Sequence, residues 1–238
     1  MSNIQVSIVM PAFNEEKNIK NALESLRNQE TDLEYEVIVV DNNSTDKTVE
    51  IAKTFTNTMN LRIINEKRQG RGPARARGFK EAKGDIILSA DSDAIFYEDW
   101  ITTLVEPLKG KVVAATTSCK IVDCAPLTNK IFNFLQPKLV YLYRIFFGDY
   151  WLSGFSFSVL KSVYEKSGGF DIELQGQEDT DLSFKVSKLG KIVFIDKPII
   201  FSGRRFKDGL WVGLYDYVSS YVAAFWFKNK KVYLSNVR

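Results

Sequence analysis

Short apolar runs alternate with amphipathic segments along the first half of the chain. The runs contain few polar residues, as is typical of strands buried on both faces of a sheet; they are 4–10, 35–41, 61–64, 85–91 and 111–118. The segments between them have apolar residues at helical spacing; they are 14–30, with Asn14 as the expected N-cap, then 44–55, 72–84 and 97–108. This alternation predicts an α/β fold, Rossmann-like, with a mostly parallel central sheet flanked by helices and joined by right-handed crossovers.

The second half of the chain is less regular. A helix that starts on acidic residues is predicted at 177–190, followed by a strand at 191–196 and a basic loop at 202–209. Two aromatic-rich segments, 131–151 and 209–228, have an apolar stripe at helical spacing. The stripes are Ile131, Phe134, Leu135, Leu139, Leu142 and Phe146 in the first, and Trp211, Leu214, Tyr215, Val218, Val222 and Phe225 in the second. Such helices pack in the core, form a homodimer interface or lie on a membrane surface, and the sequence leaves these alternatives open.

Composition and charge narrow the classes of function. The 238 residues are 45% hydrophobic, which is enough for the core of one large domain, and a net charge of +3 indicates no nucleic-acid partner. The chain has no histidine, which excludes Ser-His and Cys-His catalysis and histidine metal ligands. Acid–base chemistry therefore falls to carboxylates, lysine or tyrosine. Residues 1–5 lack a basic signal-peptide start, so we expect a cytoplasmic protein, with the inner face of the cell membrane as the alternative location.

Three polar clusters come directly after predicted strands, at Pro11–Asn14, Asp41–Ser44 and Asp91–Asp93. Ligands of parallel sheets bind beyond the carboxyl ends of the strands, so the three clusters predict a single site. Two carboxylates about 4 Å apart repel each other by about 1 kcal/mol in water and about 4 kcal/mol at an effective dielectric constant of 20. A hard divalent cation such as Mg²⁺ or Mn²⁺ would remove the repulsion between Asp91 and Asp93, and so would a solvated turn.

Four segments in consistent order resemble the motifs of family 2 glycosyltransferases of the GT-A fold. They are SIVMPAFNEEKNI, EVIVVDNNSTDKT, GRGPARARGFKEAKGDIILSADSDA and GGFDIELQGQEDTDLSFKV. The resemblance covers residues 4–205 and implies a GT-A domain at 1–205, with a nucleotide-sugar-binding half at 1–117 and an acceptor-binding half at 118–205. Residues 206–238 would then form a C-terminal amphipathic helix. The implied activity is inverting transfer from a UDP- or GDP-sugar to a hydroxyl, glycan, glycolipid or polyprenyl-phosphate acceptor, with Mg²⁺ or Mn²⁺ as cofactor.

The resemblance also implies which residues hold the donor. Asp91 and Asp93 match the family's D-x-D motif, so Asp93 would contact the metal and Asp91 would help to hold the donor. Asp41 would accept a hydrogen bond from the nucleobase, because a carboxylate suits the N3–H of uracil or the N1–H of guanine. The other implied donor-binding residues are Pro11, Ala12, Phe13, Asn14, Glu15, Asn43, Gly72, Arg75 and Ser92.

The segment QEDTD resembles the family's E-D motif and implies the catalytic residue. An inverting transfer to a hydroxyl needs a base that takes its proton, and Asp179 is the first candidate, with Asp181 in reserve. Simple acidic capping of the helix is the alternative role for these residues. Guanidinium groups bind phosphates in a bidentate manner, and the implied acceptor or phosphate contacts are Gly154, Glu178, Arg204 and Arg205.

Two other functions compete with the transferase. A sugar nucleotidyltransferase would have a glycine-rich phosphate loop after the first strand, and residues 10–18 contain no glycine. A non-catalytic nucleotide-sugar-binding protein would bind the donor without turning it over. The late Q-x-x-R-W motif of many relatives is absent, so processive synthesis is not expected.

Overall fold

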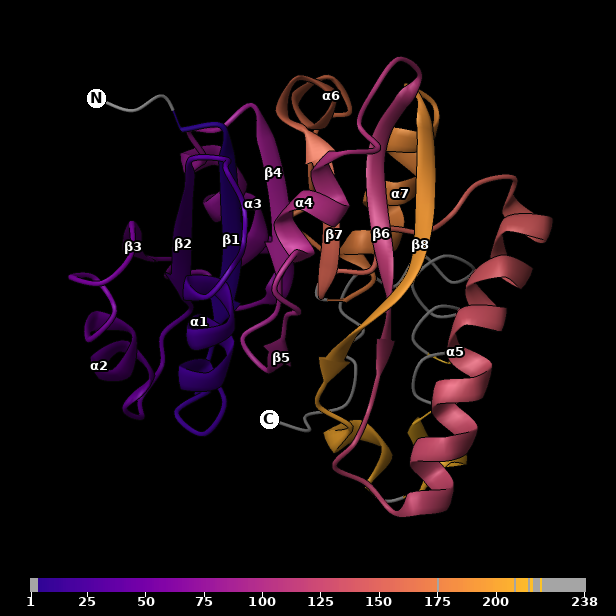
Figure 1. Ribbon diagram of the computed structural model, residues 1–238, viewed down its shortest axis with the longest axis horizontal. Helices are drawn as coiled ribbons and strands as arrows, with labels where there is room; N and C mark the ends of the chain where they lie inside the picture. The colour runs from indigo at the N-terminus through magenta and orange to yellow at the C-terminus, as the bar shows by residue number, and fades with distance from the viewer. Residues whose placement is uncertain (1–3, 175, 208, 214, 216–218, 220–238) are drawn as a thin grey trace.

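The computed structural model in Figure 1 describes residues 4–174, 176–207, 209–213, 215 and 219. They form an eight-stranded sheet in the order β3-β2-β1-β4-β7-β6-β8-β5. The strands are β1 (Val6–Ala12), β2 (Tyr35–Asp41), β3 (Leu61–Asn65), β4 (Ile86–Ala90), β5 (Ala94–Ile95), β6 (Val112–Lys120), β7 (Ser156–Leu160) and β8 (Lys191–Phe201). The helices are α1 (Ile19–Arg27), α2 (Thr48–Lys53), α3 (Arg71–Glu81), α4 (Trp100–Val105), α5 (Pro126–Phe147), α6 (Lys161–Lys166) and α7 (Glu178–Ser187), with a 3₁₀ turn η1 (Arg204–Phe206).

The first four strands of the sheet run parallel, as predicted, because β1 pairs with β2 and β4, and β2 pairs with β3. The predicted strand at 111–118 is β6, but it does not lie beside β4. Strand β7, which the sequence pattern did not reveal, lies between them and is antiparallel to both. Strand β8 pairs with β6 in parallel and is longer than the predicted 191–196. The α/β fold with a mostly parallel central sheet is confirmed, with an antiparallel strand inserted in its second half.

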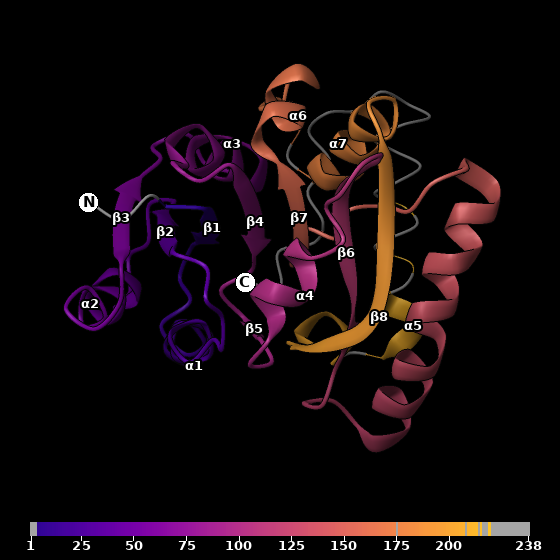
Figure 2. The same cartoon turned by 45° about the horizontal axis from the view of Figure 1, so that its top comes forward.

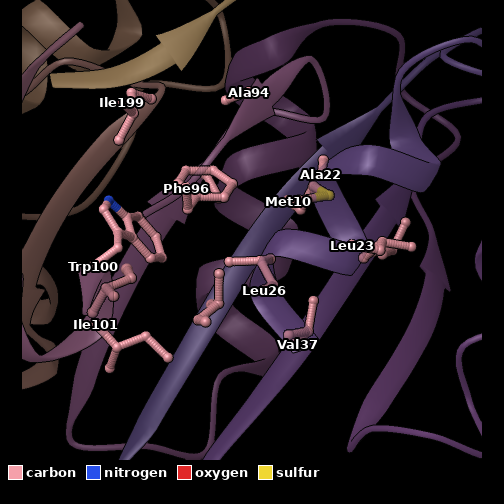
Figure 3. Packing of buried hydrophobic residues seen from close by; sticks show 14 of the residues in the cluster. Met10, Ala22, Leu23, Leu26, Val37, Ala94, Phe96, Trp100, Ile101 and Ile199 are labelled. Carbon is pink, nitrogen blue, oxygen red and sulfur yellow. The ribbon is translucent and has the colours of Figure 1, made fainter. Parts of the chain in front are cut away.

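Helices cover both faces of the sheet, and side chains that alternate along each strand serve two hydrophobic clusters. In β2, Val37 faces the cluster under α1, α2 and α4, whereas Ile38 faces the cluster under α3, α6 and α7. Figure 3 shows the first cluster, in which Met10 of β1 lies near the α1 side chains and Trp100 of α4 lies beside Phe96. These helices hold the sheet rigid on both sides, so the ends of its strands are fixed in position.

The start of the first helix differs from the prediction. Helix α1 begins at Ile19, and Asn18 occupies its N-cap position, so the assignment of Asn14 as the cap was wrong. Asn14 has a φ of +53°, and its Oδ1 accepts a hydrogen bond from the backbone N–H of Thr45 at 2.8 Å. The polar residues after β1 therefore form a loop that is tied to the loop after β2.

Helix α5 stands beside β8 at the edge of the molecule in both Figure 1 and Figure 2. Its predicted stripe does not pack in the core: Ile131 is 37% exposed and Phe146 is 74% exposed, while the buried residues of α5 are Gln136 and Val140. In the second predicted stripe, Trp211 and Tyr215 are exposed, whereas the positions outside the described residues are Leu214, Val218, Val222 and Phe225. Among the helices that the structure describes, none combines the length and hydropathy needed to cross a membrane.

Candidate active site

A cavity with an empty volume of about 440 Å³ opens where β1 and β4 end. Its lining combines the loop after β1, the start of α3, the D-x-D motif and the basic loop after β8: Pro11, Ala12, Phe13, Glu15, Asn42, Gly70, Arg71, Ala74, Arg75, Asp91, Ser92, Asp93 and Arg204. Most of these residues were expected at the site from the sequence. The ones without an individual assignment are Asn42, Gly70, Arg71 and Ala74, although Asn42 lies in the predicted cluster Asp41–Ser44.

Glu15 is fixed at the junction of the first loop and two helices. Its side chain is buried, and its backbone N–H donates to the Thr48 hydroxyl of α2 at 2.7 Å. One carboxylate oxygen accepts from the Asn18 amide at 2.8 Å, and the other accepts from Nη2 of Arg204 at 2.8 Å. Residues at opposite ends of the sequence therefore meet at one wall of the cavity.

Arg204 also holds the second carboxylate of the D-x-D motif. Its Nη2 lies 2.8 Å from Oδ2 of Asp93, whose side chain is only 4% exposed. Burial raises the pKa of Asp93 to about 7; the charge of Arg204 opposes this change, and nearby Asp91 and Glu15 add to it. Arg204 itself is positioned because Asp123 accepts the backbone N–H of Gly203 at 2.7 Å. In this structure, then, a guanidinium of the protein supplies the positive charge beside Asp93.

Arg75 joins the D-x-D motif to the E-D motif. Its side chain is 3% exposed; Nη2 contacts Oδ1 of Asp91 at 2.5 Å, and Nη1 pairs with Oε1 of Glu178. Burial works against the charge of Arg75, but the carboxylates of Asp91, Glu178 and Asp179 raise its pKa. Burial likewise opposes the charge of Asp91, yet Arg75 holds the pKa of that carboxyl below its usual value. One buried cation therefore connects two acidic motifs that are far apart in the sequence.

Asp179 lies at the start of α7, and two backbone N–H groups hold its carboxylate. Oδ2 accepts from the N–H of Gly154 at 2.9 Å, and Oδ1 accepts from the N–H of Thr180 at 2.8 Å. Burial, and then the charge of Glu178, raise the pKa of Asp179 to about 6, against the opposing charge of Arg75. A carboxylate with this pKa is ionised at neutral pH and is basic enough to accept a proton.

Gly154 packs directly on Arg75. A Cβ on Gly154 would lie 2.6 Å from Nη2 of Arg75, which is closer than carbon and nitrogen atoms approach without a bond. Its carbonyl accepts from the Ser89 hydroxyl at 2.7 Å, so the glycine is tied to β4 as well as to Asp179. The absence of a side chain here lets Arg75 and Asp179 lie next to each other.

Some of the expected site residues lie outside the cavity lining, where they have structural partners. The two oxygens of Asp41 accept from the N–H of Ser44 at 3.1 Å and from the Asn65 amide at 3.2 Å. Asp181 pairs with Lys185 on its own helix at 2.7 Å. The expected residues outside the lining are Asn14, Asp41, Asn43, Gly72, Gly154, Glu178, Asp179, Asp181 and Arg205.

Two of these residues shape the walls around the cavity. A Cβ on Gly72 would lie 2.7 Å from the carbonyl oxygen of Leu174, so this glycine allows α3 to approach the loop before α7. The amide of Asn43 donates to the Lys67 carbonyl at 2.9 Å and to Oε1 of Gln69 at 3.1 Å. The first contact joins α3 to the loop before α7, and the second joins the loops after β2 and β3.

Asn42 belongs to the predicted polar cluster Asp41–Ser44, although no individual contact was assigned to it. Its amide donates to the carbonyls of Glu66 at 2.7 Å and Arg68 at 2.9 Å, and its Oδ1 accepts the N–H of Gly70 at 2.8 Å. Asparagine side chains commonly satisfy loop backbone groups in this way. Its place directly after β2 puts it at the predicted edge of the sheet, where it shapes the cavity wall.

The chemistry of the cavity fits a divalent cation that arrives with a phosphate ligand. The described residues contain no group of three or more histidine, cysteine or acidic residues that could hold a metal ion by themselves. Mg²⁺ and similar hard cations are commonly bound through one or two carboxylates, with water and substrate phosphates completing the coordination. Asp93 and Asp91 line the cavity and supply such carboxylates.

Known sequences provide an independent comparison. Dolichol-phosphate mannosyltransferase of Pyrococcus furiosus is 34% identical over 107 residues, which cover 44% of this chain and 30% of the relative. Poly(ribitol-phosphate) beta-N-acetylglucosaminyltransferase TarS of Staphylococcus aureus is 37% identical over 157 residues, which cover 58% of this chain and 27% of the relative. The chain therefore spans less than a third of the length of these two relatives.

Solved structures agree on the fold. TarS 1–349 in complex with UDP-GlcNAc aligns with a TM-score of 0.67 at 23% identity, covering 83% of this chain and 58% of that one. Mannosyltransferase PcManGT from Pyrobaculum calidifontis, in complex with GDP-Man and Mn²⁺, aligns with a TM-score of 0.64 at 20% identity, covering 90% of this chain and 64% of that one. These likenesses confirm the expected GT-A fold. The family model "Glycosyl transferase family 2" matches residues 7–164, which is more than half of this chain. The chain therefore belongs to that family.

Proposed function

We propose that this protein transfers a sugar, with inversion, from a UDP- or GDP-sugar to a glycan or glycolipid hydroxyl, or to a polyprenyl phosphate. The observation that supports this most strongly is the bridge made by Arg75, which contacts Asp91 at the cavity and Glu178 beside Asp179. The bridge places Asp91, which is suited to binding a nucleoside diphosphate through a cation, close to Asp179, which is suited to accepting a proton. A single site that binds a donor and activates an acceptor requires this proximity.

In this proposal, Asp91 and Asp93 hold the donor through Mg²⁺ or Mn²⁺. The cation would neutralise charge that develops on the departing nucleoside diphosphate. Asp93 would hold the cation in place of its ion pair with Arg204, and the guanidinium groups of Arg204 and Arg205 would contact the diphosphate or an acceptor phosphate. Nucleotide-sugar complexes of the neighbouring folds support this role, since PcManGT was solved with GDP-Man and Mn²⁺.

Asp179 acts on the acceptor. As the acceptor oxygen bonds to the anomeric carbon, the bond from that carbon to the diphosphate breaks and the hydroxyl proton passes to Asp179. A phosphate acceptor is already ionised near neutral pH and needs no base. The name of the Pyrococcus furiosus relative, dolichol-phosphate mannosyltransferase, supports a polyprenyl phosphate as one acceptor class.

The same proposal divides the chain by role. Residues 1–117 bind the nucleotide sugar, with Arg204 completing the lining of that cavity, and residues 118–205 bind the acceptor. The predicted C-terminal helix at 206–238 lies mostly outside the described residues. We place the enzyme in the cytoplasm at the inner face of the cell membrane, where a glycolipid or polyprenyl-phosphate acceptor is found. The exposed apolar surface of α5 would then contact the membrane, and formation of a homodimer is the alternative role for this surface.

Thermal denaturation with a panel of UDP- and GDP-sugars, with and without Mn²⁺, tests donor binding. A donor at a hundredfold excess over its dissociation constant stabilises the fold by about 2.7 kcal/mol. We expect this stabilisation to require Mn²⁺ or Mg²⁺ and to be lost in Asp93→Asn. The matched control is Asp99→Asn, which removes an exposed carboxylate paired with Lys197 outside the cavity. The proposal is wrong if no nucleotide sugar shifts the transition in the presence of metal.

Product analysis separates the transferase from a non-catalytic binder. We expect release of UDP or GDP, which a binder would not produce, and we expect this release to disappear in Asp93→Asn. Formation of a new nucleotide sugar from a sugar phosphate and a nucleoside triphosphate would instead support a nucleotidyltransferase.

A further inference from the structure

Helix α5 carries the most apolar surface in the described part of the molecule. More than half of the exposed large hydrophobic side chains among the described residues belong to it: Leu127, Ile131, Phe134, Leu139, Tyr141, Leu142, Ile145, Phe146 and Phe147. Ile145 is 77% exposed and Phe146 is 74% exposed, so these side chains contact little of the remaining structure. An apolar surface this concentrated is typical of an interaction site.

Five of the exposed side chains lie on one face of the helix. Leu127, Ile131, Phe134, Tyr141 and Ile145 follow one another at intervals that are multiples or sums of three and four residues, so they form a continuous stripe. At 1.5 Å per residue, the stripe from Leu127 to Ile145 is about 27 Å long. The buried positions, Gln136 and Val140, lie on the opposite face against the sheet. The helix is thus amphipathic with its apolar stripe turned away from the protein.

The charges of α5 all have one sign. Its 22 residues include Lys130, Lys138 and Arg144 and contain no acidic residue. Lys138 lies over the ring of Phe134, with Nζ 3.5 Å from the centroid, and Arg144 donates to the Tyr150 hydroxyl at 2.8 Å. Within the described residues, no salt bridge joins these three cations to a carboxylate. Positive charge therefore accompanies the apolar stripe without being neutralised by an ion pair.

We propose that α5 lies on the surface of a membrane that contains anionic lipids, with the stripe in the interface and the basic side chains at the headgroups. Aromatic and aliphatic side chains flanked by lysine and arginine suit this environment. A second copy of the chain suits it less well. An isologous dimer brings the same patch of both copies together, which would place the three cations of each α5 against those of the other.

The C-terminal end of the apolar surface of α5 lies next to the elements that hold Asp179. At the C-terminal end of α5, Phe147 packs on Phe184 of α7 with ring centroids 5.8 Å apart, and Tyr143 packs on Trp151 at 5.5 Å. Helix α7 begins at the E-D motif, and Gly154, three residues after Trp151, holds Asp179. This part of the inference rests on the proposed function: a membrane-bound α5 would present Asp179 to an acceptor carried by the same lipid surface.

Flotation of the full chain with phosphatidylcholine vesicles, with and without 30% phosphatidylglycerol, tests the inference. We expect binding to the anionic vesicles that weakens as salt is added. Replacing both Ile145 and Phe146 by glutamate should lower partitioning at least tenfold, and each of Lys130→Gln and Lys138→Gln should lower it about fivefold. Ile172→Glu with Leu189→Glu is the matched control, because these side chains are 43% and 45% exposed and lie outside α5.

The outcomes separate the alternatives. Absence of vesicle binding, or an equal loss of binding in the Ile172 and Leu189 control, would overturn the inference. Sedimentation velocity tests the dimer alternative. If the wild type is a dimer, the Ile145 and Phe146 substitutions convert it to a monomer, and vesicle binding does not change, the apolar face is assigned to contact with a second copy instead. Thermal denaturation verifies that each variant folds. Vesicle binding needs no nucleotide sugar. The flotation result therefore tests the membrane inference independently of whether the protein has the proposed transferase activity.

Discussion

Replacing Arg75 by methionine is expected to destabilise the fold strongly, because Arg75 is the cation between buried acidic groups. Methionine preserves much of the side-chain volume but removes the charge. The substitution leaves Asp91 and Glu178 without their guanidinium partner, and the side chains of Arg75 and Glu178 are each only 3% exposed. Solvent therefore does little to compensate for the lost ion pair.

The expected loss can be worked out from the contacts. Removing one partner of a buried ion pair costs about 3–5 kcal/mol. For a chain of this size, each kcal/mol corresponds to about 2–4 °C, so Arg75→Met should lower the melting temperature by about 6–20 °C. Arg77→Met is the matched control two residues further along α3, where a half-exposed arginine pairs with Glu81 at 3.1 Å. The control should cost at most about 0.5 kcal/mol.

A second measurement is the pH dependence of the difference in unfolding free energy between wild type and Arg75→Met. The pKa of Asp91 is below its usual value in the folded protein, so its ion pair stabilises the fold above the unfolded pKa of about 4 and this contribution is lost as pH falls. In the variant, buried carboxylates without a partner take up protons more readily. The difference in stability between wild type and Arg75→Met should thus be largest near neutral pH and should narrow as pH falls below about 4.

The assay is calorimetry from pH 3 to 8. It compares wild type, Arg75→Met, Arg77→Met and the double variant Arg75→Met with Glu178→Gln. The double variant should be more stable than Arg75→Met alone, because it no longer buries the Glu178 charge without a partner. If Arg75→Met lowers the melting temperature no more than Arg77→Met does, the reasoning about the bridge is refuted.

Three further predictions concern the same site. Transfer to a hydroxyl acceptor should fall below about pH 6, where Asp179 takes up a proton; Asp179→Asn should abolish this transfer while only reducing transfer to a phosphate acceptor, and equal losses would contradict the assignment of the base. Gly154→Ala should weaken nucleotide-sugar binding in calorimetric titrations, because its Cβ would lie 2.6 Å from Nη2 of Arg75; unchanged binding would exclude a role for Arg75 in shaping the site. Arg204→Gln should tighten Mn²⁺ binding measured by electron paramagnetic resonance without nucleotide, because Asp93 is released; unchanged affinity would show that Arg204 does not compete with the cation.

Local pattern was sufficient for the parallel half of the sheet. A strand buried on both faces needs a continuous apolar run, and residues 35–41 and 85–91 have one, so β2 and β4 could be located without tertiary information. The polar residues that follow those runs lie at one edge of a parallel sheet by the geometry of the fold. Asp91 and Asp93 at the cavity were therefore predictable from their position after a strand.

Strand β7 was not predictable in the same way. Ser156 and Ser158 alternate with apolar residues, and both serines are fully buried, with the Ser158 hydroxyl donating to the Leu104 carbonyl at 2.6 Å. A serine whose hydroxyl finds a partner in the core looks, in sequence, the same as a serine that faces water. Only the packing of α4 against the sheet shows which case applies.

The sequence by itself determined the family, the parallel half of the sheet and most residues of the cavity, because these depend on short segments whose local pattern is specific. The tertiary structure alone decided the partners of Arg75, which contacts Asp91 16 positions away and Glu178 103 positions away. It also decided that the apolar stripe of α5 faces outward. Helical periodicity is identical for a stripe buried in the core and a stripe on a membrane, so only the location of the sheet determines which side of the helix is covered.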